Sequence, residues 1–382
     1  MSDATAKRPT WAEINLDNLV HNFRLMKSAA APGGAILAAV KADAYGHGAV
    51  RCARALELAG CEWLGVALPE EGFELRDAGV ARPILCMSGF WDGQEEAIIS
   101  RRLTPALFRL DLLDRFDRAS RAAGVVSSYH LKVDTGMGRL GVPGGDLEGF
   151  LDEAARFRSL KLDGVMTHFA SADDPHQAEF TAGQISSFDR AVATVRARGF
   201  APGWIHEANS AATHATAVPR GNLVRLGGVL YGLWRDVTNP LFPPLDWRPV
   251  MSLHTRVLYL KTVPAGSALG YGGTFVTQRP SHIATLPVGY EDGLSRALSN
   301  RGRVIVRETL APIVGRVSMD LTLVDVTDVP GVALGDEVVI IGSQGESRVT
   351  AEEVAALAGT ISYEVTCGIS DRVPRKTVTS GQ

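Results

Sequence analysis

One lysine near the start of the chain stands where covalent chemistry is possible. Residues 35–40 form an apolar run, Lys41 follows it directly, and the glycine-containing stretch 42–48 comes next. A lysine that is partly removed from water has a lowered pKa, and its neutral amine forms a Schiff base with an aldehyde. An isolated lysine at a strand end would more often only extend its ammonium group into water. The surrounding sequence makes Lys41 the first candidate for a reacting group.

Other polar residues occur at the ends of predicted strands: Lys132, Arg139, His168, Asn209, Ser210 and Arg225, followed by Gly227 and Gly228. In a barrel of eight parallel strands the carboxyl ends meet on one side, which holds the active site and often a phosphate site after strands 7 and 8. Tyr45, Ser210 and the backbone amides near Gly227 would then donate hydrogen bonds to a phosphate. Ser210 also suits the cap of the following helix, and the two roles are compatible.

The elements that must position these residues alternate along the first part of the chain. Predicted strands lie at residues 35–40, 63–68, 83–87, 103–107, 129–133, 164–169, 204–208 and 223–227. Helical periodicity separates them, for example at residues 49–59, 69–77, 110–123 and 177–197. This alternation predicts a TIM-type (β/α)8 barrel within an α/β fold. An open doubly wound sheet is the weaker alternative, because no G-x-G-x-x-G follows the first strand.

The alternation of strand and helix patterns ends after about residue 236. A proline-rich connector at residues 239–249 precedes β-type runs at 252–263, 282–287, 302–307, 311–317, 321–326 and 336–341, with one clear helix at 350–358. We therefore predict a barrel domain over residues 12–240 and a mainly β domain over residues 241–382. A strand predicted at residues 11–15 could join either domain.

Composition excludes several classes of function. The 382 residues are 46% hydrophobic and 21% charged, with a formal net charge of −3, so they offer no basic surplus for binding nucleic acid or an anionic membrane. The start lacks the apolar segment of a secretory signal, and no apolar stretch is long enough to span a bilayer. The four cysteines lie far apart without the spacing of a metal site, so we expect free thiols, no metal and a cytoplasmic protein.

Residues 39–48, AVKADAYGHG, closely resemble the cofactor-lysine motif of the alanine racemases. Further stretches resemble the same family, in order, at residues 132–139, 167–173, 209–212, 287–293, 315–320 and 362–365. The resemblance covers nearly the whole chain and both predicted domains. It implies a fold-type III enzyme that uses pyridoxal 5'-phosphate, bound as a Schiff base on Lys41, to interconvert L-alanine and D-alanine. In a bacterium this reaction supplies D-alanine for peptidoglycan.

The resemblance implies two acid/base groups, Lys41 and Tyr271, the latter acting in the site of a partner subunit within a homodimer. Racemisation must remove the α-proton from one face and deliver a proton to the other, so two groups must flank the α-carbon. A tyrosine with its ordinary pKa near 10 is a poor base at neutral pH. The family's neighbour for this tyrosine is His168, held by Arg225.

The remaining roles are also implied by the resemblance. Arg225 faces the cofactor's ring nitrogen, which suits a racemase because an arginine does not readily give up a proton. Arg139 bridges the cofactor's phenolic oxygen and the substrate carboxylate, to which Met319 offers its backbone amide. Lys132 is either carbamylated, orienting Arg139, or a plain lysine. Completing the sets, the cofactor-binding residues are Lys41, Tyr45, Arg139, His168, Asn209, Ser210, Arg225, Gly227, Gly228 and Tyr363, and Asp173, Arg296 and Arg316 line the access funnel.

The sequence departs from the family pattern at three places. Ala268-Leu269 precedes Gly270 where a Val-Ser pair is usual, Ser318 stands where cysteine is common, and Gly228 replaces an aliphatic residue. A broader substrate range that includes serine or lysine stays open. A fold-related decarboxylase is disfavoured by Arg225, and a single-barrel cofactor-homeostasis protein by the long β domain. A non-catalytic structural protein would not explain the polar residues at the strand ends.

Overall fold

The computed structural model describes residues 8–29, 34–215, 221–235 and 245–379, and these divide into two compact units. The described parts of residues 19–230, with 245–247, form the barrel unit. Residues 8–18, 231–235 and 248–379 form the β unit. The predicted domain limit at residues 240 and 241 lies outside the described residues. Among the described helices, none combines the length and the hydropathy that crossing a membrane requires.

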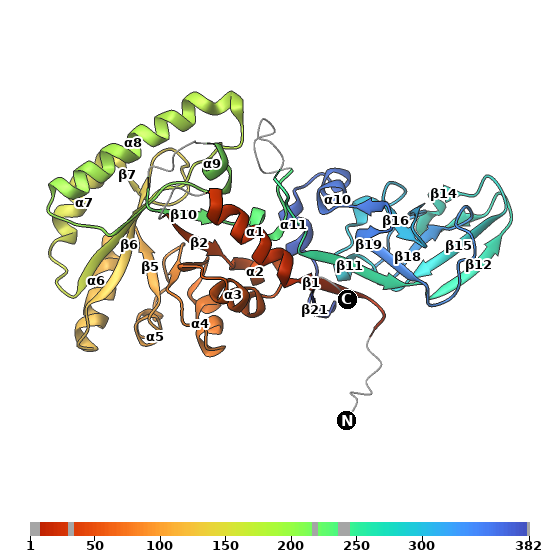
Figure 1. The fold of residues 1–382 in the computed structure, drawn as a ribbon, viewed down its shortest axis with the longest axis horizontal. Helices are drawn as coiled ribbons and strands as arrows, with labels where there is room; N and C mark the ends of the chain where they lie inside the picture. Colours follow the sequence, from red (N-terminus) through yellow and green to blue (C-terminus); the bar gives the residue numbers. More distant parts are fainter. Residues whose placement is uncertain (1–7, 30–33, 216–220, 236–244, 380–382) are drawn as a thin grey trace. The chain divides into compact units, whose positions relative to one another are not determined.

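The barrel unit contains eight parallel strands, confirming the predicted fold class (Figure 1). They are β2 (Ala35–Ala39), β3 (Trp63–Val66), β4 (Ile84–Cys86), β5 (Thr104–Leu107), β6 (Ser127–Asp134), β8 (Leu160–Met166), β9 (Trp204–His206) and β10 (Leu223–Leu226). The hydrogen-bonded order is β10-β2-β3-β4-β5-β6-β8-β9, and the short β7 (Val142–Pro143) pairs with β6. Each strand overlaps one of the predicted runs.

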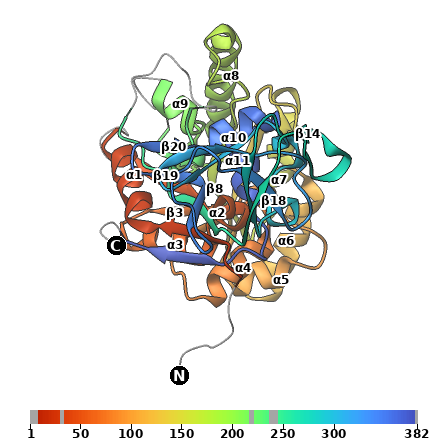
Figure 2. The ribbon, with the colours of Figure 1, turned by 90° about the vertical axis from the view of Figure 1, so that its right-hand side faces the viewer.

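Helices surround these strands. They are α1 (Leu16–Ala29), α3 (Ala49–Leu58), α4 (Pro69–Asp77), α5 (Glu95–Ser100), α6 (Leu110–Ala122), α7 (Leu147–Ala154), α8 (Ala178–Ala197) and α9 (Ser210–Ala215). Figure 2 shows α1 and α3–α8 arranged around the outside of the barrel. In α1, Leu19, Phe23 and Met26 recur at helical spacing and are all buried. Such a stripe buries one face of each helix against the strands.

The barrel is nearly closed, and its two end strands, β9 and β10, meet at a seam. These two strands share no ladder, but the backbone N–H of Asn222 donates to Ile205 O at 3.0 Å and that of Arg225 donates to Ala208 O at 3.0 Å. The Asn222 side chain adds a bond from Nδ2 to Gly203 O at 2.7 Å and accepts one from the Ile205 N–H at 2.8 Å. One asparagine therefore supplies part of the pairing that a ladder would give.

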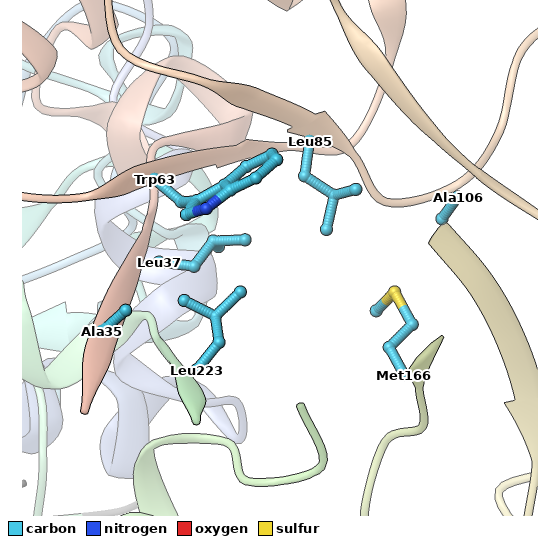
Figure 3. Packing of buried hydrophobic residues seen from close by; sticks show 7 residues of the cluster. All are labelled: Ala35, Leu37, Trp63, Leu85, Ala106, Met166 and Leu223. Atoms are coloured by element: carbon cyan, nitrogen blue, oxygen red, sulfur yellow. The ribbon is translucent and has the colours of Figure 1, made fainter. Parts of the chain in front are cut away.

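Apolar side chains fill the barrel interior. Figure 3 shows them pointing toward one another from six strands: Ala35, Leu37, Trp63, Leu85, Ala106, Met166 and Leu223. All of them are at most 7% exposed. This packed layer supports the carboxyl ends of the strands, where polar residues follow.

The β unit is built from three sheets. The largest has the order β17 (Thr309–Pro312), β16 (Arg303–Val306), β19 (Glu337–Gln344), β11 (Met251–Arg256), β1 (Trp11–Asn15) and β21 (Arg375–Val378), with β20 (Ser347–Val349) beside β19. The second contains β12 (Tyr259–Val263), β15 (Ser281–Leu286) and β18 (Thr322–Asp325), and the third is the hairpin of β13 (Ala268–Leu269) and β14 (Phe275–Val276). The strand β1, left open by the sequence, thus pairs with β11 and β21.

Two expectations for this unit were incomplete. The run 252–263 is not one strand but β11 and β12, which belong to different sheets. No glycine or proline marks the break at residues 257–258, so the pattern gave no signal for it. Besides the predicted helix, observed as α10 (Ala351–Ala358), the chain forms α11 (Ser362–Cys367). This short segment contains β-branched and aromatic residues, which are weak helix formers.

A buried carboxylate ties the start of the chain to the β unit. Asp292 is fully buried; Arg8 Nη1 and Nη2 donate to its two oxygens, and Arg372 Nε lies 3.6 Å from Oδ1. The backbone N–H of Gly289 donates to Oδ2 at 2.9 Å.

We expect Asp292→Ala to lower the free energy of unfolding of the β unit by about 3 kcal/mol. This is the low end of the range for breaking a buried ion pair, because both arginines keep part of their surface in water. Urea unfolding followed by fluorescence measures the change. The control is Asp328→Ala, which removes an exposed pair with Arg279 and should cost no more than about 1 kcal/mol. Equal effects of the two substitutions would contradict the prediction.

Candidate active site

The residues after β2 form a left-handed turn. In α2 (Lys41–Gly46), the φ angles of Ala42, Asp43, Ala44 and Tyr45 are 51°, 51°, 54° and 55°. This conformation costs an L-residue about 1–2 kcal/mol, so other bonds must hold it. Glu71 Oε1 accepts from the Ala42 N–H at 2.6 Å, and Asp43 Oδ1 accepts from the Ala49 N–H at 2.6 Å. Lys41 is half-buried at the start of this turn, whose backbone these two carboxylates hold.

The turn carries Tyr45 toward the end of β10. Tyr45 is 8% exposed, and its hydroxyl lies so close to Gly227 that a Cβ there would sit 2.5 Å from it. The Gly227 N–H donates to Ser210 Oγ at 3.0 Å. The hydroxyls of Tyr45 and Ser210 therefore both lie next to Gly227, and a side chain at Gly227 would occupy the space of the Tyr45 hydroxyl. Gly228 follows and begins the turn η3 (Gly228–Tyr231).

Asn209 shapes the segment between β9 and α9. Its Oδ1 accepts from the Ala212 N–H at 3.0 Å, and its Nδ2 donates to Phe169 O at 3.4 Å. Asn209 therefore caps α9 and fixes Ser210, the first residue of that helix.

Arg225 is buried at the end of β10 and donates into neighbouring strand ends. Its Nη1 bonds His206 O at 2.7 Å, and its Nη2 bonds Thr167 O at 2.6 Å and Glu207 O at 3.1 Å. Nη2 also lies 3.2 Å from His168 Nδ1. Burial lowers the pKa of Arg225 to about 10, so the side chain is still a cation at neutral pH.

The contact with Arg225 fixes the proton on His168. Arginine only donates hydrogen bonds, so His168 Nδ1 must accept and the ring proton must lie on Nε2. Burial and then the charge of Arg225 lower the pKa of His168 to about 2. His168 is therefore a neutral ring that presents an N–H at Nε2.

The same reasoning assigns the ring proton of His206, which also contacts Arg225. His206 Nδ1 faces Arg225 Nη1 at 3.3 Å and must accept, so His206 Nε2 donates to His130 Nδ1 at 2.9 Å. Burial lowers the pKa of both histidines, that of His130 to about 4. The His130 ring lies 5.2 Å from the ring of Trp63 in the apolar interior. Arg225 is therefore followed by two neutral histidines, and its contact with His206 determines which ring nitrogen of His206 carries the proton.

Four cationic side chains gather at this end of the barrel: Lys41, Lys132, Arg139 and Arg225. Lys132 is 5% exposed, and burial, then the charges of Arg225, Arg139 and Lys41, lower its pKa to about 8. Arg139 lies in the exposed loop after β6, where Asp134 Oδ1 accepts from the backbone N–H groups of Gly136 and Gly138 at 2.9 and 3.1 Å. This crowding of positive charge fits an anionic ligand, and the donors around Gly227 fit a phosphate.

In the β unit, Tyr271 stands at the tip of the β13–β14 hairpin. It opens the turn η4 (Tyr271–Gly273) and is 72% exposed. A Cβ at Gly272 would lie 3.3 Å from Arg316 Nη1, so the arginine side chain covers this turn. The unusual pair before Gly270 forms β13 itself, with Leu269 buried.

The motif around Met319 crosses the segment around Gly289. The Tyr290 N–H donates to Ser318 O at 3.0 Å and the Glu291 N–H to Met319 O at 3.1 Å. A Cβ at Gly289 would lie 2.3 Å from both carbonyl oxygens, so only glycine permits this crossing. The Met319 side chain is 51% exposed.

Asn300, which the sequence did not single out, joins two of these loops. Its Oδ1 accepts from the Gly315 N–H at 2.6 Å, and its Nδ2 donates to Thr274 Oγ1 at 3.1 Å, next to the Tyr271 turn. Its φ of 58° is one that asparagine tolerates better than most residues.

The structure therefore separates the predicted residues into two sets. The barrel unit brings together Lys41, Tyr45, Lys132, Arg139, His168, Asn209, Ser210, Arg225, Gly227 and Gly228. Asp173 lies exposed in the loop after β8. The β unit carries Tyr271, Arg296, Arg316, Met319 and Tyr363, with Arg296 exposed in η6 (Arg296–Leu298) and Tyr363 half-buried in α11. His206, His130 and Gln184 were missed. Gln184 had one signal, a polar residue at the helical spacing of the buried Phe188, Ala191 and Val195.

Comparisons with known proteins match nearly the whole chain to one family. Residues 14–234 match the family profile described as alanine racemase, N-terminal domain, and residues 250–377 match the profile of its C-terminal domain. An alanine racemase from Syntrophobacter fumaroxidans is 45% identical over 360 residues, covering 94% of this chain and 95% of the relative. One from Halothermothrix orenii is 44% identical over 371 residues, covering 97% of each chain.

Solved structures give the same result. The crystal structure of an alanine racemase from Streptomyces lavendulae has a TM-score of 0.91 at 36% identity and covers 98% of both chains. That of a Bacillus anthracis alanine racemase with bound L-Ala-P has a TM-score of 0.91 at 35% identity, covering 99% of this chain and 97% of that one. That of a Bartonella henselae alanine racemase with covalently bound pyridoxal phosphate has a TM-score of 0.86 at 29% identity, covering 97% and 99%.

Proposed function

The chain belongs to the alanine racemase family and interconverts L-alanine and D-alanine, and we propose that Lys41 and Tyr271 of a second subunit carry its two proton transfers. The observation that supports Lys41 most directly is its place at the end of β2, on a turn held by Glu71 and Asp43, beside the other cations of the barrel end. The charge of the Lys41 amine contributes to lowering the pKa values of Lys132 and His168, so the amine lies near both side chains.

The barrel-end donors fit the family's cofactor. Bound covalently through Lys41, pyridoxal phosphate would withdraw electrons from the α-carbon of alanine and weaken its bond to hydrogen. Tyr45, Ser210 and the amides of Gly227 and Gly228 would hold the phosphate group, with Asn209 fixing Ser210 and Tyr363 adding a hydroxyl. Arg225, a cation at neutral pH, would donate to the ring nitrogen and leave it unprotonated.

His168 could stabilise the deprotonated form of Tyr271. Its Nε2–H can donate to a phenolate oxygen, which lowers the cost of removing the phenol's proton. Because the pKa of His168 is about 2, the ring keeps this form over the whole working range of pH. The exposed position of Tyr271 at a hairpin tip suits a residue that serves a partner's site in a homodimer.

We infer the substrate-binding groups from the roles that the family resemblance implies. Arg139 would hold the carboxylate of alanine with its fork of donors, and the Met319 amide would add a further bond. Asp173, Arg296 and Arg316 are exposed charges that would line the approach to this site. Such groups would bind an amino acid through its carboxylate.

The function is tested by incubating the purified protein with L-alanine, L-serine or L-lysine and separating the enantiomers by chiral chromatography. We expect D-alanine to form fastest and to reach equal amounts with L-alanine. Rescue of a bacterial strain that requires D-alanine would connect the reaction to peptidoglycan. A cofactor-loaded protein that forms no D-amino acid would contradict the proposal.

Lys132 is a candidate for carbamylation, in which the neutral amine bonds to the carbon of CO2 and releases a proton to water. With a pKa of about 8, roughly a quarter of the amine is neutral at pH 7.5, compared with about 0.1% for an ordinary lysine. The resulting anion would pair with Arg139 and relieve the crowding of cations.

We expect a carbamate carbon signal in the 13C NMR spectrum of protein equilibrated with 13C-bicarbonate, weakening as the pH falls below 8. The signal should be lost in Lys132→Ala and retained in the control Lys161→Ala, which alters an exposed lysine bound to Asp163. Identical spectra for Lys132→Ala and the unmodified protein would leave Lys132 as a plain lysine.

A further inference from the structure

A buried glutamine in α8 touches both loops that carry the polar groups of the barrel end. Gln184 is 1% exposed, although it belongs to a helix on the outside of the barrel. Its Nε2 donates to Thr135 Oγ1 at 3.3 Å and to the carbonyl of His168 at 3.2 Å. Its Oε1 accepts from the Ala170 N–H at 3.0 Å. One amide group therefore makes three hydrogen bonds to two loops.

The first loop is the one that bears Arg139. It follows β6, and a Cβ at Gly136 would lie 3.2 Å from Phe180 Cζ and 3.6 Å from Gln184 Cγ, so this part of the loop rests on one face of α8. Gln184 Nε2 donates to Thr135 Oγ1, and the Thr135 hydroxyl also shares a hydrogen bond with Thr167 Oγ1, 2.8 Å away. These bonds connect Gln184 through Thr135 to Thr167, the residue before His168.

The second loop follows β8 and bears His168. The carbonyl of Thr167 accepts from Arg225, and the carbonyl of His168 accepts from Gln184. His168 is therefore held on both sides, through its ring by Arg225 and through its backbone by Gln184. An apolar residue at position 184 would remove the bonds that the Ala170 N–H, the His168 carbonyl and the Thr135 hydroxyl make with this amide. Losing hydrogen bonds of this kind is destabilising.

We propose that Gln184 is a positioning residue that fixes the Arg139 loop and the His168 loop relative to each other. This inference rests on the proposed roles of Arg139 and His168 in the site. Gln184 touches neither substrate nor cofactor; it acts through the loops. Its loss should raise KM for alanine, because Arg139 is displaced, and should lower kcat, because His168 is displaced.

The test compares three variants of the full-length, cofactor-loaded enzyme. Gln184→Met keeps the volume and removes every bond of the amide. Thr135→Val is nearly isosteric; it removes the bond from Gln184 to the Arg139 loop and the bond between Thr135 and Thr167, but leaves the bonds of Gln184 to the His168 loop. Val192→Ala, on the same helix, also removes buried contacts but no hydrogen bond, because its side chain is apolar. Measurements are kcat and KM for L-alanine, and amide hydrogen exchange of residues 134–140 and 167–173.

We expect Gln184→Met to lower kcat/KM by roughly 100-fold, the size of effect that a displacement of about 1 Å produces, and to speed exchange in both segments. Thr135→Val should raise KM with little change in kcat and speed exchange in residues 134–140 alone. Val192→Ala should keep kcat/KM within about twofold, even if it is less stable. If Gln184→Met does not fold, Thr135→Val still tests the bond.

Two outcomes would overturn the inference. One is a kcat/KM for Gln184→Met, or a KM for Thr135→Val, equal to that of Val192→Ala. The other is unchanged hydrogen exchange in both segments. Failure of the proposed function would look different, because the unmodified enzyme itself would then form no D-alanine, while the exchange measurements would still report on the two loops.

Discussion

Lys41→Ala is expected to lower the rate of alanine racemisation by at least about 10⁴-fold, the upper range for loss of one positioned acid/base group. The substitution removes both the amine that would hold the cofactor covalently and the group that would serve one face of the α-carbon. Rates are measured by chiral chromatography with each enantiomer as the substrate. Intact mass after borohydride reduction should show the added mass of the cofactor on the unmodified protein and not on Lys41→Ala.

The matched control is Lys161→Ala, which removes an exposed lysine of the same unit. It should keep full activity and the covalent mass. A Lys41→Ala protein that still carried the cofactor covalently would assign its attachment to another lysine, and one that kept its activity would remove Lys41 from the reaction.

Tyr271→Phe is expected to lower racemisation by about 10²–10⁴-fold while leaving cofactor binding intact, because only the phenolic hydroxyl is removed. Mixing this variant with Lys41→Ala should then restore activity. In a symmetric dimer whose sites combine both subunits, some heterodimers rebuild one complete site with Lys41 from one chain and Tyr271 from the other. The measurement is the specific activity of the mixture against that of each variant alone.

Subunit exchange must be shown independently, for example with two differently tagged chains. Tyr259→Phe, an exposed tyrosine of β12 in the same unit, is the control and should keep full activity. No recovery in a mixture that has exchanged its subunits would place Tyr271 in the site of its own chain or outside the site.

The alternation of strands and helices was sufficient to predict the barrel, because each strand is a short apolar run that repeats at regular intervals. It was also sufficient to gather the barrel residues of the site, since the carboxyl ends of parallel strands meet. The left-handed turn after β2 could not be predicted. Ala42, Asp43 and Ala44 are ordinary residues in a conformation that local preference opposes, and only tertiary bonds such as that from Glu71 select it.

The buried polar network was beyond prediction for a related reason. His130, His206 and Arg225 lie on three different strands, β6, β9 and β10, and nothing in the sequence shows that their side chains meet. Gln184 lies in a helix whose other buried positions are apolar. A single sequence shows that such residues are unusual for their place, but their partners follow only from the three-dimensional arrangement of the strands and loops.

The seam of the barrel has a mechanical consequence. Ser210 follows β9 and Gly227 follows β10, so the bond between them spans the same gap that Asn222 bridges lower down. A phosphate held by both residues would add a further connection between the ends of β9 and β10. Binding it would then strengthen the seam, and we expect the cofactor-free protein to be cleaved faster by proteases than the cofactor-loaded form.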